Sequence, residues 1–416
     1  MPPAEQHLTD TVEDTASEDV TTMKTTNNSR KKDFTRDARI YEYGSAANPQ
    51  LAPIPVLVHP ATLHESGPTA IHPFDISDFL QIDYPCTSPN LMASFLRIVQ
   101  GESLTTTAKA TSQAFYVIRG TGYTTSKQDG KIAWSAGDLL VFPASSQTLQ
   151  HVCTNDEQES VETNGAALYW IHDEPLLNYL GVQPAGNKFQ TTLFKKQDML
   201  ERVEEIKHSS DGHSNNRLGV LLGNAKCDQT KTLTHVLWSL LNSISAKTVQ
   251  RPHRHNSVAL DLCVSAKPGV YTLIGNEIDA NGFIVDPIRC DWVPGAAFLT
   301  PPALWHSHHN ESDDVAWVLP IQDAGLYTHQ RTLDIRFVDD ELKLHAAGRI
   351  RGSGAFSAAD KQYMEVQALA GLEPKVARMK RVFSTDCLPS NKRTKSVQIG
   401  KEIAEETDDG AAVPRV

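Results

Sequence analysis

The sequence predicts an all-β protein that contains two copies of one barrel, with short helices and disordered ends. The first observation behind this is that short apolar runs with β-branched and aromatic residues, bounded by Gly or Pro, dominate the chain. Residues 114–120 and 139–142 are runs of this kind in the first half, and residues 258–266, 269–274 and 295–300 are in the second. Helical periodicity is confined to a few segments.

The second observation is an internal repeat. Residues 142–144 (Phe-Pro-Ala) lead to an apolar strand and then to a turn at Asp173. Residues 300–302 (Thr-Pro-Pro) lead in the same way to Asp323. A repeat period of about 150 residues predicts two copies of one barrel.

The ends and the middle of the chain differ from the two repeats. Both ends are polar with almost no apolar periodicity, and such segments cannot offset the entropy cost of ordering. Residues 197–207 combine charge with helix formers, which predicts a connecting helix. We therefore expect a disordered tail at 1–37, a first barrel at 38–194, a linker with a helix at 195–228, a second barrel at 229–383 and a disordered tail at 384–416.

Length and composition restrict the classes of function. A chain of 416 residues is too long for one small barrel and suits two domains. The net charge of −11 argues against broad nucleic-acid contact. There is no run of about 18 apolar residues and no apolar segment typical of a secretory signal at the start, so we expect no membrane partner. The six cysteines are scattered, which favours reduced thiols and a cytoplasmic location.

Three histidines form a candidate metal site. His253 and His255 are two residues apart, and side chains of a strand alternate with period two, so both point to the same face. His306 lies on a later strand that the fold can bring back beside them. Three imidazoles on one side of a metal leave the opposite side open.

These histidines lie in a pattern that resembles the paired signature of the cupin superfamily. The second half of the signature runs from Gly295 to Asn310 and differs only at Ala303, where the family usually has Gly. The first half lacks the usual Glu, because Ala259 and Leu260 occupy its place. Together with the sequence around His306, this loss resembles the gentisate 1,2-dioxygenase branch.

The resemblance implies a bicupin, that is, two jelly-roll barrels of the double-stranded β-helix type. It also implies a single mononuclear Fe(II) held by the three histidines, with dioxygen and a small aromatic acid as substrates. Imidazole suits Fe, Zn, Cu and Ni alike, so the choice of iron rests on the resemblance. A homo-oligomer remains open.

The first copy is predicted to have a degenerate metal site. The signature would place Glu at Gln113, a His-x-His pair within residues 106–109 and the last ligand at Thr148. None of these positions carries a good ligand. His151 is three residues late for the last ligand position and would bind only if the preceding loop holds an insertion.

Further residues are candidates for orienting a ligand or contacting substrate. His308 and Asp261 share strand parity with the proposed ligands, which turns them inward in a regular strand. Asp261 is thus a candidate partner for an imidazole N–H. Arg251 and Arg254 flank the ligand strand, and Arg251 is a candidate for contacting substrate. Arg254 alternates away from the ligands, which favours a solvated side chain or a structural ion pair over carboxylate binding. Trp305 fits core packing at least as well as a site role. No residue is assigned as catalytic.

Three functions remain open at this point. The first is an Fe(II)-dependent dioxygenase that opens the ring of a gentisate-like acid. The second is a cupin isomerase, cyclase or lyase acting on a natural-product intermediate without redox iron. The third is a metal-binding cupin without catalysis.

Overall fold

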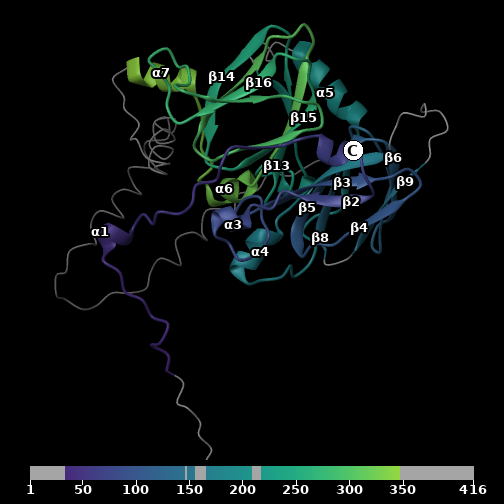
Figure 1. Ribbon diagram of the computed structural model, residues 1–416, viewed down its shortest axis with the longest axis horizontal. Coiled ribbons are helices and arrows are strands. Elements are labelled where there is room, and N and C mark those ends of the chain that lie inside the picture. The colour runs from purple at the N-terminus through teal and green to yellow at the C-terminus, as the bar shows by residue number, and fades with distance from the viewer. Residues whose placement is uncertain (1–32, 146–147, 155–164, 209–216, 347–416) are drawn as a thin grey trace, which may run out of the picture. The chain divides into compact units, whose positions relative to one another are not determined.

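The computed structural model describes residues 33–145, 148–154, 165–208 and 217–346 (Figure 1). The described residues before Ala52 form one compact unit and those from Ala52 onward form another. In the first unit, the short helix α1 (Tyr43–Ala46) is capped by Glu42, whose carboxylate accepts hydrogen bonds from two backbone N–H groups. The predicted tail at 384–416, the end of the predicted second barrel beyond 346 and most of the tail at 1–37 lie outside the described residues.

The first barrel consists of two antiparallel sheets. Its strands are short and rich in β-branched and aromatic residues, as the sequence indicated. The six-stranded sheet has the order β11 (Thr192–Phe194), β8 (Leu139–Ser145), β5 (Ala110–Arg119), β10 (Ala166–His172), β3 (Met92–Ile98) and β2 (Ala70–Pro73). The four-stranded sheet has the order β4 (Ser103–Thr106), β9 (Leu149–Cys153), β6 (Thr121–Ser126) and β7 (Gly130–Ser135).

The second barrel repeats this plan with a six-stranded and a five-stranded sheet. The six-stranded sheet has the order β1 (Leu57–His59), β18 (Ala297–Thr300), β15 (Ala259–Ser265), β20 (Ala316–Gln322), β13 (Trp238–Ile244) and β12 (Leu218–Leu222). The five-stranded sheet has the order β17 (Ile288–Asp291), β16 (Val270–Gly275), β19 (Trp305–Asn310), β14 (Thr248–His255) and β21 (Ile335–Phe337). The predicted all-β fold of two barrels is confirmed.

One strand from early in the chain belongs to the second barrel. β1 pairs with β18, so that Val58 lies opposite Phe298. The segment that follows it, with the short helices α2 (Thr62–Glu65) and α3 (Ser77–Leu80), leads into β2 and β3 of the first barrel. The chain therefore contributes to the second barrel's sheet before it begins the first barrel.

The central strands of both six-stranded sheets are buried on both faces, which explains their nearly continuous apolar character. In β5, Ala114 and Tyr116 belong to a large core cluster shared with the second barrel, whereas Phe115 and Val117 belong to the interior of the first barrel. The shared cluster also contains Leu260 and other residues of β15, β18 and β20. Because side chains alternate along a strand, each sheet packs its own barrel interior on one face and the other barrel's sheet on the other.

The turn after the last long strand is the same in both copies. Asp173 begins α4 (Glu174–Leu180) and Asp323 begins α6 (Ala324–Gln330). Both carboxylates are buried, and each accepts a hydrogen bond from a backbone N–H of a neighbouring segment of the same chain, that of Ser112 (2.9 Å) and that of Val258 (3.0 Å). The repeated Asp therefore fixes the same turn against the same neighbouring strand in each barrel.

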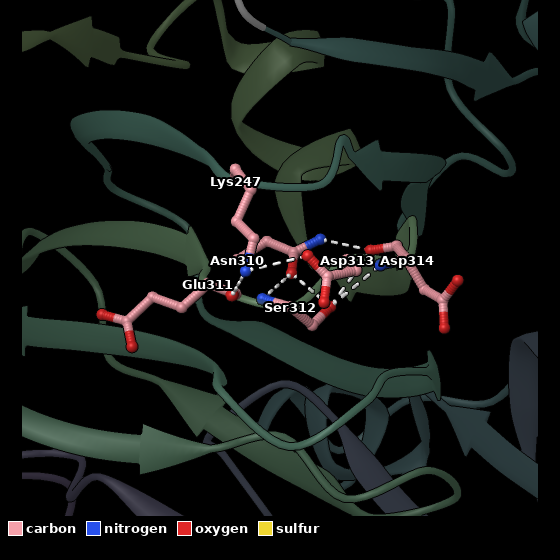
Figure 2. Close-up of polar contacts among 6 residues, drawn as sticks. All are labelled: Lys247, Asn310, Glu311, Ser312, Asp313 and Asp314. Carbon is pink, nitrogen blue, oxygen red and sulfur yellow. Dashed lines mark hydrogen bonds and ion pairs between the residues drawn. The ribbon is translucent and has the colours of Figure 1, made fainter.

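The turn between β19 and β20 is held by Asn310, the last residue of the predicted signature (Figure 2). Its Nδ2 donates to the carbonyl of Asp314 at 2.8 Å, and its Oδ1 accepts from the backbone N–H and hydroxyl of Ser312 at 3.0 and 2.7 Å. Lys247 forms an ion pair with Asp313 of the same turn at 3.0 Å. The buried Asn310 amide satisfies the backbone of a tight turn and so fixes the end of the strand that carries His306.

The remaining elements are few. Within the predicted connecting segment, α5 (Lys196–His208) buries Met199 and Val203, and a 3₁₀ turn, η2 (Ala225–Cys227), follows β12. Helix α7 (Val338–Ala346) comes directly after β21. None of the described helices is long and apolar enough to cross a membrane. The described cysteines are buried free thiols, namely Cys86, Cys153, Cys227, Cys263 and Cys290, whereas Cys387 lies outside the described residues.

Candidate metal centre

The structure brings His253, His255 and His306 together. His253 and His255 lie at the end of β14, and His306 on β19 lies opposite His253 in the antiparallel ladder. One ring nitrogen from each of the three residues lies within 4.8 Å of the others. The ring centroids of His253 and His306 are 4.0 Å apart, and those of His255 and His306 are 4.8 Å apart. A single ion can be reached by all three rings.

The hydrogen bonds of these rings suit a metal. His255 Nδ1 is 2.8 Å from the carbonyl oxygen of Ser257, and His306 Nδ1 is 3.1 Å from that of Leu304. A carbonyl only accepts, so each Nδ1 carries the proton and each Nε2 keeps its lone pair, which is how metal-binding histidines are oriented. His253 Nδ1 is buried and has no hydrogen-bond partner among the described residues. The donor set fits a metal ion.

Burial keeps these imidazoles neutral at physiological pH. It lowers the pKa of His255 to about 4 and is the main reason that the pKa values of His253 and His306 are well below the ordinary range. Neutral imidazole is the form that binds metal. Three neutral ligands leave the charge of a divalent ion uncompensated by the protein.

A β-bulge sets which residues of β14 face the interior. Gln250 lies opposite His308, but His253 lies opposite His306, so one additional residue is inserted in β14 between these pairs. The bulge turns Arg251 away from the barrel interior, although Arg251 has the same parity as the ligands. Arg251 pairs with Asp339 at 2.9 Å and is outside the pocket lining. Arg251, predicted as a candidate for contacting substrate, therefore forms an ion pair outside the pocket instead.

Two positions of the signature have left-handed backbone conformations. Gly295 has φ +80°, and a Cβ there would lie 3.1 Å from the ring of His64 on α2. Ala303 has φ +67°, a conformation that favours Gly, which accounts for the usual Gly of the cupin signature. The Ala303 N–H donates to the carbonyl of His255 at 2.7 Å. This turn therefore links the strand of His306 to the strand of His255.

The three histidines lie at the wall of a cavity of about 210 Å³ in the second barrel. This is smaller than the roughly 300–1,000 Å³ of pockets for drug-sized ligands, so it suits a molecule with one ring. Arg217 is the only cation and Asp261 the only carboxylate among the described lining residues. The other lining side chains come mainly from β12, β13 and β20, including Leu221, Trp238, Leu240, Val318 and Pro320.

Arg217 is a functional candidate that the sequence did not reveal. It immediately precedes β12, and its Nη2 donates to the carbonyl of Arg251 at 2.7 Å. Its guanidinium carbon lies 4.8 Å from the ring centre of Phe337. Burial lowers the pKa of Arg217 to about 10, which leaves it charged at neutral pH. No motif surrounds this arginine, so no sequence signal could have found it.

His308 faces the same pocket but has a different tautomer. Trp292 Nε1 donates to Thr272 Oγ1 at 2.8 Å, and Thr272 Oγ1 is 2.9 Å from His308 Nδ1. The Thr272 hydroxyl has no other acceptor among the described residues, so its hydrogen goes to Nδ1. The His308 proton is then on Nε2, which makes this ring a hydrogen-bond donor rather than a fourth ligand.

Asp261 and Trp305 have separate surroundings. Asp261 lies in the pocket wall and accepts a hydrogen bond from Thr300 Oγ1 at 2.7 Å, and among the described residues no imidazole N–H donates to it. Burial raises the pKa of Asp261 to about 7. Trp305 is buried outside the pocket lining, with the Arg254 guanidinium 4.7 Å from its ring centre. Trp305 therefore fits the packing role.

Three hydrogen-bonded side chains, a Trp, a Thr and a His, occur in both barrels and show which residue of the first barrel corresponds to which residue of the second. Trp134 Nε1 donates to Thr124 Oγ1 at 3.0 Å, and Thr124 Oγ1 is 2.9 Å from His151 Nδ1. This repeats the series that ends at His308, so His151 corresponds to His308 and not to His306.

The metal positions of the first barrel then carry no ligand set. Leu149 takes the place of His306, because it lies two residues before His151 as His306 lies two residues before His308. It pairs with Thr106 on β4 as His306 pairs with His253 on β14. The prediction that Thr148 holds this place is wrong by one residue, since loop lengths do not show the ladder register. Within the described residues, only His253, His255 and His306 form a group that could hold a metal.

His151 itself has no free ring nitrogen. Its Nδ1 is 2.9 Å from Thr124 Oγ1, and its Nε2 is 2.9 Å from Thr106 Oγ1. Burial lowers the pKa of His151 to about 3. His151 is therefore a neutral core residue with both nitrogens bonded.

Comparison with known proteins supports this architecture. No family model and no curated protein matches the chain. Among solved structures, a salicylate 1,2-dioxygenase from Pseudaminobacter salicylatoxidans superimposes with a TM-score of 0.56 at 11% identity, covering 73% of this chain and 95% of that one. A point mutant of the same enzyme, in complex with gentisate, gives a TM-score of 0.54 at 13% identity, covering 72% and 91%. This chain has a bicupin fold.

For this bicupin, we expect one tightly bound metal ion per chain, held by the second barrel. The reason is the difference between the three histidines there and the Thr106, Ala108 and Leu149 positions of the first barrel. Elemental analysis after dialysis against a weak chelator measures the ratio. Two equivalents of tightly bound metal per chain would contradict the assignment.

Proposed function

We propose that this protein is an Fe(II)-dependent dioxygenase of the cupin type, which cleaves the ring of a gentisate-like hydroxylated aromatic acid. The observation that carries the proposal is the pairing of three neutral imidazoles with one buried cation, Arg217, in a pocket sized for one ring. The likeness in fold to the salicylate 1,2-dioxygenase supports it.

The charges of the pocket favour an acid as substrate. His253, His255 and His306 would hold the iron without adding negative charge, so an anionic, chelating substrate neutralises the ion on binding. Arg217 is already desolvated, which strengthens its attraction for a carboxylate. A hydroxylated aromatic acid supplies both the chelating oxygens and the carboxylate.

Bound Fe(II) would supply the redox chemistry that lets dioxygen react with the ring. The residues of this chain bind and orient the substrate and exclude water. Arg217 would fix the acid group, and Leu240, Val318 and Pro320 would pack against the ring. His308 Nε2–H would donate a hydrogen bond to a substrate oxygen in the pocket. Holding the reactants in one orientation is the main contribution expected of the protein.

The test is oxygen consumption by protein loaded anaerobically with Fe(II), followed for a panel of hydroxybenzoic acids. We expect uptake with gentisate or a related acid and none with benzoate, which lacks the hydroxyl, or hydroquinone, which lacks the carboxyl. Arg217→Leu should raise KM at least about tenfold, because one charge-assisted hydrogen bond is lost. Arg289→Leu is the matched control, since Arg289 lies on β17 and pairs with Asp291 at the surface.

A second candidate function follows from Asp261 and His308. A carboxyl with a pKa of about 7 and a ring with an Nε2 proton lie in one pocket, which suits proton transfer in an isomerase, cyclase or lyase. Such an enzyme turns over its substrate equally well without dioxygen and with Zn(II) in place of iron. Turnover of this kind, with no oxygen uptake on any hydroxybenzoate, would overturn the dioxygenase proposal.

A further inference from the structure

A second cavity, of about 260 Å³, lies in the first barrel. Its wall comes from β2, β3 and β10, together with residues of α4. The metal pocket is lined by β12, β13 and β20, which occupy the same three places in the second barrel's sheet. The lining residues of this first-barrel cavity are Ile71, Pro73, Pro85, Met92, Ser94, Trp170, His172, Glu174 and Asn178.

The strand ladders show that the two cavities correspond position by position. Met92 pairs with His172 in the first barrel, and Trp238 pairs with Gln322 in the second. Two residues further along, Ser94 takes the position of Leu240, which lines the metal pocket. The first barrel therefore has a cavity at the position that the metal pocket occupies in the second barrel, although it lacks the metal ligands.

Two side-chain donors lack a hydrogen-bond partner among the described residues, one on His172 in the cavity wall and one on Gln113, which is outside the lining. His172 is 5% exposed, and its Nδ1 accepts a long hydrogen bond, 3.4 Å, from the backbone N–H of Glu174. The proton is then on Nε2, for which the described residues provide no acceptor. Gln113 lies opposite His172 in the ladder, and its Oε1 accepts from Trp170 Nε1 at 3.2 Å. This fixes the amide so that Nε2 is the free end, and this atom is buried without a partner.

The charges of the first-barrel cavity differ from those of the metal pocket. No Lys or Arg is among its described lining residues, and Glu174 adds a carboxylate at α4. Burial lowers the pKa of His172 to about 3, so the ring is neutral. An anion would find no cation here, whereas an oxygen acceptor would find an unused donor. Trp170, Met92 and Pro73 provide apolar surface for a ring.

We propose that the first barrel binds a small, uncharged ring compound that carries a carbonyl oxygen, without a metal. The oxygen accepts a hydrogen bond from His172 Nε2, and the ring packs against Trp170 and Met92. Providing an acceptor for this donor in the cavity wall, which has no hydrogen-bond partner among the described residues, gives the selectivity for an acceptor. This site is separate from the metal pocket and does not depend on the reaction proposed for it.

The experiment uses benzamide as the uncharged probe and benzoate as its anionic counterpart, with the full chain and isothermal titration calorimetry. We expect benzamide to bind with a Kd of about 1 mM or tighter, as suits a ligand of this size. Ser94→Phe fills the first-barrel cavity and should weaken benzamide at least about tenfold. Leu240→Phe places the same side chain at the corresponding position of the metal pocket and should leave benzamide binding unchanged.

His172→Phe is the second variant, because it keeps a ring in place and removes the donor. It should weaken benzamide by a factor of about five to ten, the value of one hydrogen bond. Near-ultraviolet circular dichroism checks that each variant is folded, and His172→Phe carries the test if Ser94→Phe does not fold. Three results overturn the proposal. Benzamide binding survives both first-barrel changes, it is lost only in Leu240→Phe, or the unaltered protein does not bind benzamide. Benzoate binding that equals benzamide binding and is lost in Ser94→Phe also overturns it.

Discussion

His306→Ala is expected to abolish metal retention while leaving the fold intact. His306 supplies one of three ligands, so we expect the affinity for the metal to fall by more than about 100-fold, beyond the effect of losing a residue that only orients a ligand. The strand itself is held by its ladders to β14 and β16 and by the side chain of Asn310. The free energy of unfolding of the metal-free protein should therefore fall by less than about 2 kcal/mol.

His309→Ala is the matched control for this prediction. His309 lies on the same strand but on its other face, where its ring stacks on Tyr271 with the centroids 4.8 Å apart. The variant should keep the metal, as measured by elemental analysis and by competition with a chromophoric chelator. If His309 instead of His306 proves essential for metal binding, the register assigned to this strand is wrong, and with it the inward orientation of His308.

Asp261→Asn is expected to stabilise the metal-free protein, and more strongly at alkaline pH. Burial raises the pKa of Asp261 to about 7 in the folded protein, whereas an unfolded Asp has a pKa of about 3.9. The folded state therefore holds a proton that the unfolded state releases, and stability is lost as the pH rises from about 4 to about 7. Asparagine avoids this cost and can still accept the hydrogen bond from Thr300.

Urea unfolding of the two proteins at pH 5 and at pH 8 measures the effect. The stabilisation by Asp261→Asn should be on the order of 2 kcal/mol greater at pH 8 than at pH 5. Two titratable neighbours, Tyr169 and Cys290, stay protonated in this range, because burial raises their pKa values, that of Cys290 to about 11. Asp291→Asn, at an exposed ion pair with Arg289, is the control and should show little difference. A stabilisation that is equal at both pH values, or larger at pH 5, would contradict the assignment.

The sequence by itself determined the fold class and the group of three histidines. Short apolar runs and the repeated turn at Asp173 and Asp323 depend on local rules of strand alternation and turn chemistry, and these hold wherever the strands pair. The same alternation places His253 and His255 on one face. The signature from Gly295 to Asn310 places His306 by local geometry. Gly295 and Ala303 have left-handed backbone conformations, and the buried amide of Asn310 fixes the turn at the end of the strand.

Only the tertiary structure decided which other residues share the pocket. A bulge in β14 turns Arg251 outward, and a ladder register that loop lengths do not reveal puts Leu149, not Thr148, at the position of His306. Arg217 enters the pocket from a segment without any motif, and β1 joins the second barrel from the start of the chain. These features depend on pairing between residues far apart in sequence, and no local pattern encodes such pairing.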